Sequence, residues 1–182
     1  TPIPYKIVTI ASGFADTNVV AVGADANGLQ YIDLQLTGTS PGGTWRMAFE
    51  NLNIVASTQN QVWTTSGYVR LVAGSLTGLS SFIAGHIAYT SGGAALLNHE
   101  VAVSPPTSAS LVSQRFVATA TASDATVAFV RPTYSFTVAA ATINATIRIA
   151  CSQMELGDFA TSYIPTATVA VTATVTVTVT VT

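Results

Sequence analysis

The side chains of this chain best suited to acid–base chemistry are its eight carboxylates. They are Asp16, Asp25, Asp33, Glu50, Glu100, Asp124, Glu155 and Asp158. Glycoside hydrolysis needs two such groups across one bond, and these are dispersed with no spacing that brings two together. Cys151, the sole cysteine, has no histidine near it in the sequence to activate it as a nucleophile. We therefore predict no catalytic residue and no enzyme.

The two histidines are the candidate metal ligands. His86 and His99 flank the turn-forming Ser91-Gly92-Gly93, and a hairpin there would place them face to face with Glu100 close by. Two histidines and a carboxylate can bind a transition metal. Strand histidines with ordinary hydrogen-bond partners are much commoner than ligands, so we predict neither a metal nor a cofactor.

Aromatic residues suggest glycan binding, because sugar rings stack on flat aromatic faces while polar groups bind their hydroxyls. Trp45 follows the Gly42-Gly43 loop and adjoins Arg46, which places both at a sandwich edge as candidate contacts, with Tyr89 as a further platform. Trp63 and Tyr68 lie five residues apart in one predicted strand and hence on opposite faces. Large aromatic residues usually fill the core, which is where we expect Trp63.

The elements that must position these residues are β-strands. Residues Ile32, Leu34 and Leu36 alternate with polar ones, as in a half-buried strand. Similar runs predict eight or nine strands, with Trp63, Phe116 and Phe136 in the core. The further runs are 44–50, 61–72, 82–89, 95–103, 114–121, 126–130, 134–139 and 144–152. Short strands between Gly, Pro and Asn clusters favour a β-sandwich.

Composition limits the possible partners. Only 8% of the 182 residues are charged, against about 25% in an average soluble protein, which favours obligate assembly with other subunits. The six basic residues are scattered and the net charge is −2, so we expect no nucleic-acid binding. No run of about 18 apolar residues occurs, so no membrane span is predicted.

A resemblance to a known family rests on the segment Gln153-Met-Glu-Leu-Gly-Asp-Phe-Ala-Thr-Ser-Tyr-Ile-Pro-Thr166. It resembles the closing motif of jelly-roll domains in bacteriophage tail fibres and other virion surface proteins, which are themselves similar to carbohydrate-binding modules. The resemblance covers residues 29–166. It implies an all-β jelly-roll sandwich there. Outside this range, short apolar runs predict an N-terminal arm at residues 1–28, and the alternation of Thr and Val predicts a strand-like C-terminal extension at 167–182, where the chain departs from the family's charged and polar continuation.

Two functions follow as expectations. The first is a non-enzymatic part of a phage virion, in the head decoration or the tail fibre, assembled in the host cytoplasm and acting on the particle surface. Its expected partners are other virion proteins and two further copies of the chain in a homotrimer. The alternative is a carbohydrate-binding module for host-surface or polymeric glycans. The Thr/Val alternation of 168–182 is either a genuine strand that binds a neighbouring subunit or a stand-in for uncertain sequence.

Overall fold

The computed structural model describes residues 7–11, 16–49 and 55–162, which form eleven strands and one short 3-10 turn. The strands are β1 (Ile7–Ala11), β2 (Asp16–Ala24), β3 (Gln30–Thr39), β4 (Gly43–Phe49), β5 (Val55–Ala56), β6 (Val62–Ser75), β7 (Leu79–Tyr89), β8 (Ala95–Ala102), β9 (Arg115–Thr121), β10 (Phe129–Val138) and β11 (Thr142–Leu156). The turn, η1, spans Leu111–Ser113. None of the helical structure among these residues is long and apolar enough to cross a membrane.

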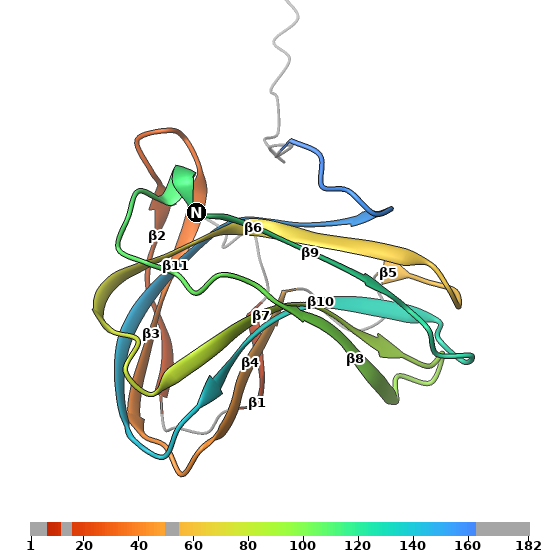
Figure 1. Ribbon diagram of the computed structural model, residues 1–182, viewed down its shortest axis with the longest axis horizontal. Helices are drawn as coiled ribbons and strands as arrows, with labels where there is room; N and C mark the ends of the chain where they lie inside the picture. Colours follow the sequence, from red (N-terminus) through yellow and green to blue (C-terminus); the bar gives the residue numbers. More distant parts are fainter. Residues whose placement is uncertain (1–6, 12–15, 50–54, 163–182) are drawn as a thin grey trace, which may run out of the picture.

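The strands form two antiparallel sheets that pack face to face (Figure 1). Sheet A has the order β1-β4-β10-β7-β8, with the short β5 beside β10. Sheet B has the order β2-β3-β11-β6-β9 and arches over sheet A. The chain crosses between the sheets repeatedly, so neighbouring strands within a sheet come from distant parts of the sequence. The predicted all-β jelly-roll fold is confirmed.

Alternation of side chains decides which face of each strand enters the core. Ile32, Leu34 and Leu36 are each at most 1% exposed and point inward, as predicted. The intervening Asp33 lies on the outer face of sheet B, where it accepts two hydrogen bonds from Arg148. Period-two alternation therefore sorts apolar from charged side chains along this strand.

Aromatic rings join the two sheets at the centre of the core. The ring of Phe82 lies 4.9 Å from that of Phe136 and 5.5 Å from that of Phe116, which comes from sheet B. Phe116 also meets Tyr134 edge-on at 5.0 Å. Trp63 belongs to a second cluster with Ala88 and Val130. The predicted burial of Trp63, Phe116 and Phe136 is confirmed.

The predicted break between residues 130 and 134 is wrong, because β10 runs without interruption through Pro132. Proline lacks an N–H group and is usually excluded from central strands. In β10 it lies where the neighbouring strand changes, since β5 pairs up to Val130 and β4 pairs from Thr133. The strand tolerates Pro132 because this position falls at a gap in the adjoining pairing.

The N-terminal boundary also needs correction. Residues 1–28 were expected to form an arm outside the sandwich, yet β1 pairs with β4 in sheet A and β2 pairs with β3 in sheet B. Both strands complete sheets of the same sandwich. The predicted extension at 167–182 lies outside the described residues.

The closing motif fixes the chain after β11. The Glu155 carboxylate accepts hydrogen bonds from the Thr161 hydroxyl at 2.5 Å and from its backbone N–H at 3.1 Å. The Gln153 amide donates to the same hydroxyl at 3.4 Å. On the other side, Arg115 donates to the Thr161 carbonyl. Glu155 of the motif therefore holds a turn.

Two glycines with similar backbone angles give a test of the strand packing. Gly74 in β6 has φ +77° and an added Cβ would lie 2.2 Å from the Asn144 carbonyl oxygen, whereas Gly28 has φ +79° and an added Cβ would meet nothing within 4 Å. We expect Gly28→Ala to lower the free energy of unfolding by about 1 kcal/mol, from backbone strain alone. Gly74→Ala should cost at least about 3 kcal/mol, because the clash with β11 adds to that strain. Urea denaturation measures both, and equal losses would contradict the packing.

Candidate functional site

The outer face of sheet A gathers polar side chains from four neighbouring strands. Pairing places Arg46 of β4 opposite Ser135 of β10, while the next row across the sheet contains Thr133, Gly85 of β7 and Glu100 of β8. We call this surface the sheet A face and define it by the outward side chains of Arg46, Ile87, Tyr89, Glu100, Arg131, Thr133 and Ser135.

An ion pair crosses the sheet A face. Arg46 donates from Nε to Glu100 Oε1 at 3.1 Å and from Nη2 to Oε2 at 2.8 Å, and the Thr133 hydroxyl donates to the same Oε1 at 2.9 Å. The two charged side chains are 17% and 9% exposed. Two parallel bonds fix the planes of both groups. The pair, called the Arg46–Glu100 bridge below, is a preorganised set of donors and acceptors in a recess.

Glycine at position 85 allows this arrangement. A Cβ on Gly85 would lie 2.2 Å from the His99 carbonyl oxygen and 2.8 Å from the Glu100 Cα. Strands β7 and β8 can therefore approach closely only without a side chain at this point. Gly85 therefore keeps Glu100 of the edge strand β8 in register beside Thr133 on the sheet A face.

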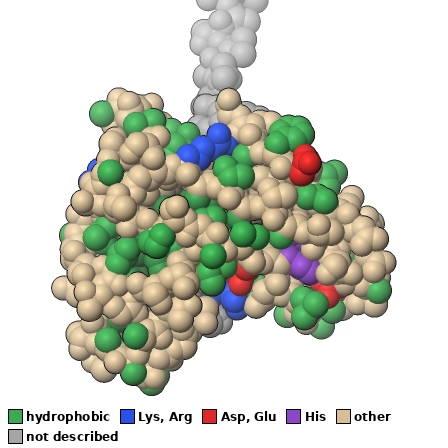
Figure 2. Space-filling view, in the orientation of Figure 1, with side chains coloured by type: hydrophobic (Ala, Val, Ile, Leu, Met, Phe, Trp, Pro, Cys, Tyr) green, Lys and Arg blue, Asp and Glu red, His purple; other side chains and the backbone are tan. Residues whose placement is uncertain are grey.

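Charge is sparse elsewhere on the visible surface. Figure 2 shows a mainly uncharged surface. Its lower outline has a notch, with β1 and β4 on one side and β8 on the other. Acidic and basic side chains lie at this notch. The notch lies on the outer side of sheet A, which arches in the same direction in Figure 1. An ion pair in such a recess is partly shielded from water, so its hydrogen bonds are stronger than those of a fully exposed pair.

The predicted glycan contacts divide between the two sides of sheet A. Arg46 and Tyr89 lie on the sheet A face, six residues apart along β10, or about 20 Å. Trp45 was expected at a sandwich edge, and this is wrong: its side chain is 1% exposed, packs 6.1 Å from Phe136 and donates from Nε1 to the Thr17 hydroxyl at 3.0 Å. Adjacent strand residues point to opposite faces, so burying Trp45 turns Arg46 outward.

Other predicted aromatic positions hold. Trp63 points into the core and Tyr68 packs outside sheet B beside Leu111 of η1, on opposite faces as predicted. Tyr89, at 6% exposure, is too recessed to offer a broad flat platform. Stacking on a large exposed aromatic ring is thus not the feature that dominates the sheet A face.

The sequence analysis did not identify Thr133 or Ser135 as site residues. It also did not predict that Arg46 pairs with Glu100. The signal was present in Arg131-Pro-Thr-Tyr-Ser-Phe-Thr137, where polar and apolar residues alternate strictly. That alternation marks a central strand with a polar outer side. Glu100 was considered only as one of the dispersed carboxylates and as a neighbour of the histidines, yet it faces away from them because it follows His99 directly in β8.

The predicted histidine pair exists, without a third ligand. His86 and His99 are directly paired across β7 and β8 with ring centroids 5.1 Å apart. His99 Nε2 lies 2.6 Å from Asp124 Oδ2, and no cluster suited to a metal ion occurs among residues 7–11, 16–49 and 55–162. The ring nitrogens of His86 are buried with no partner in the described part of the chain.

The carboxylates have structural partners. Asp25 accepts hydrogen bonds within its turn, Asp33 pairs with Arg148, Asp124 with His99 and Glu155 with Thr161. A Gly-x-Ser-x-Gly sequence at 38–42 was also overlooked, but Ser40 there accepts a hydrogen bond from the Gly42 N–H at 2.9 Å between β3 and β4. This loop joins two strands and lacks the strand-to-helix turn of a nucleophile elbow.

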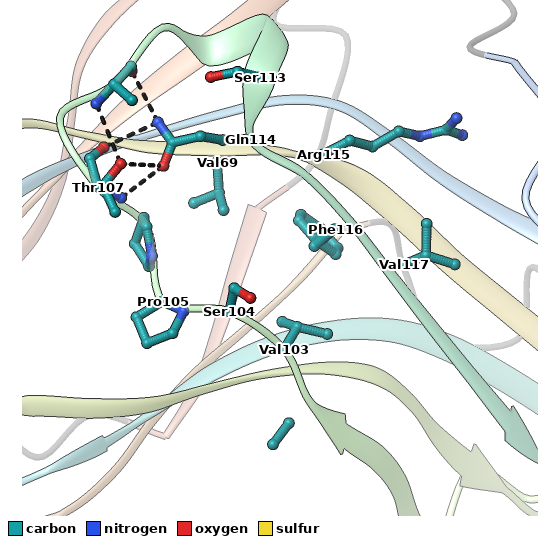
Figure 3. A pocket seen from close by; sticks show the side chains of 13 residues that line it. Val69, Val103, Ser104, Pro105, Thr107, Ser113, Gln114, Arg115, Phe116 and Val117 are labelled. Atoms are coloured by element: carbon teal, nitrogen blue, oxygen red, sulfur yellow. Dashed lines mark hydrogen bonds between the residues drawn. The ribbon is translucent and has the colours of Figure 1, made fainter.

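A cavity of about 600 Å³ lies between the edge strands β8 and β9, beside the segment that joins them (Figure 3). Val69, Val103 and Phe116 form an apolar wall. The Gln114 amide closes the rim by bonding to the backbone N–H and C=O of Thr107, at 2.7 and 3.0 Å. None of the predicted site residues lines this cavity.

Comparison with solved structures supports the fold. An arabinose-bound α-L-arabinofuranosidase, MgGH51, superposes with a TM-score of 0.52 over 84% of this chain and 23% of its own length, at 15% identity. The shared feature is the jelly roll. At this identity the likeness shows a fold, and the chain spans less than a quarter of the enzyme.

Two further jelly rolls overlap most of this chain with lower scores. The CBM22-1 xylan-binding domain of Paenibacillus barcinonensis Xyn10C has a TM-score of 0.48 at 18% identity, covering 85% of this chain and 87% of its own. A CBM4 module has a TM-score of 0.45 at 14% identity, covering 84% and 86%. No family model matches this chain, and no curated protein matches it.

Burial of His86 predicts sensitivity to acid. Burial lowers its pKa from 6.5 to about 4, with repulsion from His99 adding to the effect and Asp124 opposing it. Between these pH values the unfolded chain binds a proton that the folded jelly roll does not, so the free energy of unfolding falls as pH drops from 6.5 to about 4, by roughly 3 kcal/mol. Thermal unfolding across this range should show a smaller loss in His86→Leu. Identical slopes for the two proteins would contradict this assignment.

Proposed function

We propose that this chain is a non-catalytic carbohydrate-binding module that holds a polysaccharide against the sheet A face. The observation that carries the proposal is the Arg46–Glu100 bridge with Thr133. Its guanidinium and carboxylate are partly exposed and held together by two hydrogen bonds, while the Thr133 hydroxyl is buried and bonded to Glu100. The jelly-roll fold is in keeping with this reading, since one of the compared structures is described as a xylan-binding domain.

Sugar hydroxyls both donate and accept hydrogen bonds, so they need a surface that offers both kinds of partner. Arg46 supplies donors only, Glu100 acceptors only, and Thr133 either. The opposite charges of Arg46 and Glu100 cancel, which suits an uncharged glycan better than a strongly acidic one. Host-surface or polymeric glycans of neutral sugars are therefore the proposed ligands.

Binding without catalysis fits the surroundings of the described carboxylates. Asp25, Asp33, Glu100, Asp124 and Glu155 have separate hydrogen-bond partners, and no two of them share one. The proposed role is to hold a polysaccharide in place.

A matched pair of variants tests the site. Glu100→Gln breaks the Arg46–Glu100 bridge, and Asp33→Asn breaks a bidentate pair of similar exposure on the outer face of sheet B, where Arg148 and Asp33 are 18% and 6% exposed. Both should destabilise the fold by about 2–3 kcal/mol, because each leaves a half-buried guanidinium unpaired. Only Glu100→Gln should lose glycan binding, by about tenfold or more.

Native affinity electrophoresis in gels containing soluble xylan, arabinoxylan or mixed-linkage β-glucan measures this loss. Retardation of the wild type by at least one polymer is expected, with Asp33→Asn retarded equally. Absence of retardation in every gel, or equal loss in both variants, would sink the proposal.

A second role, as a structural component on the surface of a phage virion, is favoured by one observation. The edge strand β2 exposes Val19, Val20 and Val22 at 41–51% in a chain with only 8% charged residues. Exposed apolar edges invite pairing with another chain. The expected partners are two further copies in a homotrimer and other virion proteins. None of the compared structures named above is a virion protein.

Solution mass tests this role. Light scattering coupled to size exclusion should give a trimer for the wild type and a monomer for Val20→Lys, because a lysine on an edge strand opposes pairing. A wild-type monomer at all concentrations would remove the support that β2 lends to subunit assembly.

A further inference from the structure

The outer side of β10 is unusually polar for a central strand. The inward side of the strand carries Tyr134 and Phe136, and its outward side carries Arg131, Thr133 and Ser135. Arg131 is 6% exposed, and Thr133 and Ser135 are each 0% exposed. Outward polar residues in a sheet are normally solvated. This polar row is instead covered, so its hydrogen-bonding capacity must be met by other groups.

The Arg46–Glu100 bridge explains part of the burial of these outward side chains of β10. Strands β10 and β7 separate β4 from β8, and three strand spacings amount to about 14 Å. Arg46 and Glu100 nevertheless meet at 2.8 Å. Both long side chains must therefore lie across β10 and β7, over the row that contains Thr133.

Ser135 is left unsatisfied under this arrangement. Its hydroxyl is fully buried and has no hydrogen-bond partner in the described part of the chain, although it stands in register with Arg46 and two residues from Thr133. A buried hydroxyl without a partner costs stability. Alanine at this position would avoid that cost, so the hydroxyl calls for another explanation.

We propose that Ser135 is a hydroxyl-recognition residue for the glycan, uncovered when the Arg46–Glu100 bridge opens. The inference rests on the proposed function and deepens it. A sugar hydroxyl that reaches β10 can donate to Ser135 Oγ and accept from it, as neither Arg46 nor Glu100 can do alone. The guanidinium and carboxylate released from each other then bind neighbouring hydroxyls of the same sugar.

In the free protein, the Arg46–Glu100 bridge thus occupies the hydrogen-bonding groups that the glycan would bind. Arg46 and Glu100 satisfy each other, whereas the Ser135 hydroxyl has no partner among the described residues. In the complex all three groups bind the glycan. Ligand binding would therefore replace one intramolecular set of hydrogen bonds with a larger intermolecular set.

Ser135→Ala tests the inference, because it separates binding from stability. Dissociation constants from calorimetry with soluble xylan, arabinoxylan and mixed-linkage β-glucan should rise about 3- to 10-fold on whichever polymer the wild type binds. The midpoint of thermal unfolding should stay the same or rise, since an unpaired buried hydroxyl is removed. Thr137→Ala, one position further along the same outer side and exposed, serves as the matched control and should bind like the wild type.

The outcomes are distinct. Wild-type affinity in Ser135→Ala, together with loss of binding in Glu100→Gln, would overturn the role of Ser135 and leave the proposed function intact. A lower unfolding midpoint in Ser135→Ala would show that the hydroxyl stabilises the fold, and would also overturn it. A wild type that binds none of the three polymers would remove the proposed function and this inference together.

Discussion

The contact between the two sheets at Phe82 is the interaction on which the rest of this structure depends. Phe82 of sheet A meets Phe116 of sheet B, and Phe136 and Tyr134 pack beside them. Each large aromatic residue buries about 150–250 Å², so this cluster supplies much of the apolar burial that holds the sheets together. Because β7 and β10 turn these rings inward, their alternate residues must face outward.

That constraint is what creates the sheet A face. In β10, Tyr134 and Phe136 point into the core, so Thr133 and Ser135 must point outward. In β4, Trp45 points into the core, so Arg46 must point outward. Polar residues at these outer positions leave the core undisturbed. The surface can therefore vary in chemistry while the fold is retained, as expected for a site carried on a common architecture.

Much of the fold could be predicted from local pattern, because period-two alternation and turn residues act within a few positions of each other. The strand from 30 to 39 and the burial of Trp63 follow from such patterns. The continuous β10 could not be predicted, since tolerance of Pro132 depends on where β4 and β5 end beside it. Likewise, β1 and β2 looked separate because their partners become evident only from strand pairing.

The site was predicted less well for the same reason. Arg46 and Tyr89 were identified as residue types, but the link from Arg46 to Glu100 crosses two intervening strands and 54 positions of sequence. No local pattern encodes such a contact. The outward placement of Trp45 beside Arg46 was avoidable, because two adjacent residues of a strand point to opposite faces of the sheet.

The hydrogen bonds around Thr161 have a mechanical consequence. Glu155 and Gln153 hold this residue from β11, and Arg115 holds it from β9, one of the two edge strands of sheet B. A pulling force applied beyond Ser162 would reach these side-chain bonds before it reached the β11–β6 ladder. The closing motif thus acts as a shear clamp that lets β11, the longest strand of the jelly roll, keep its register while the chain beyond it is under tension.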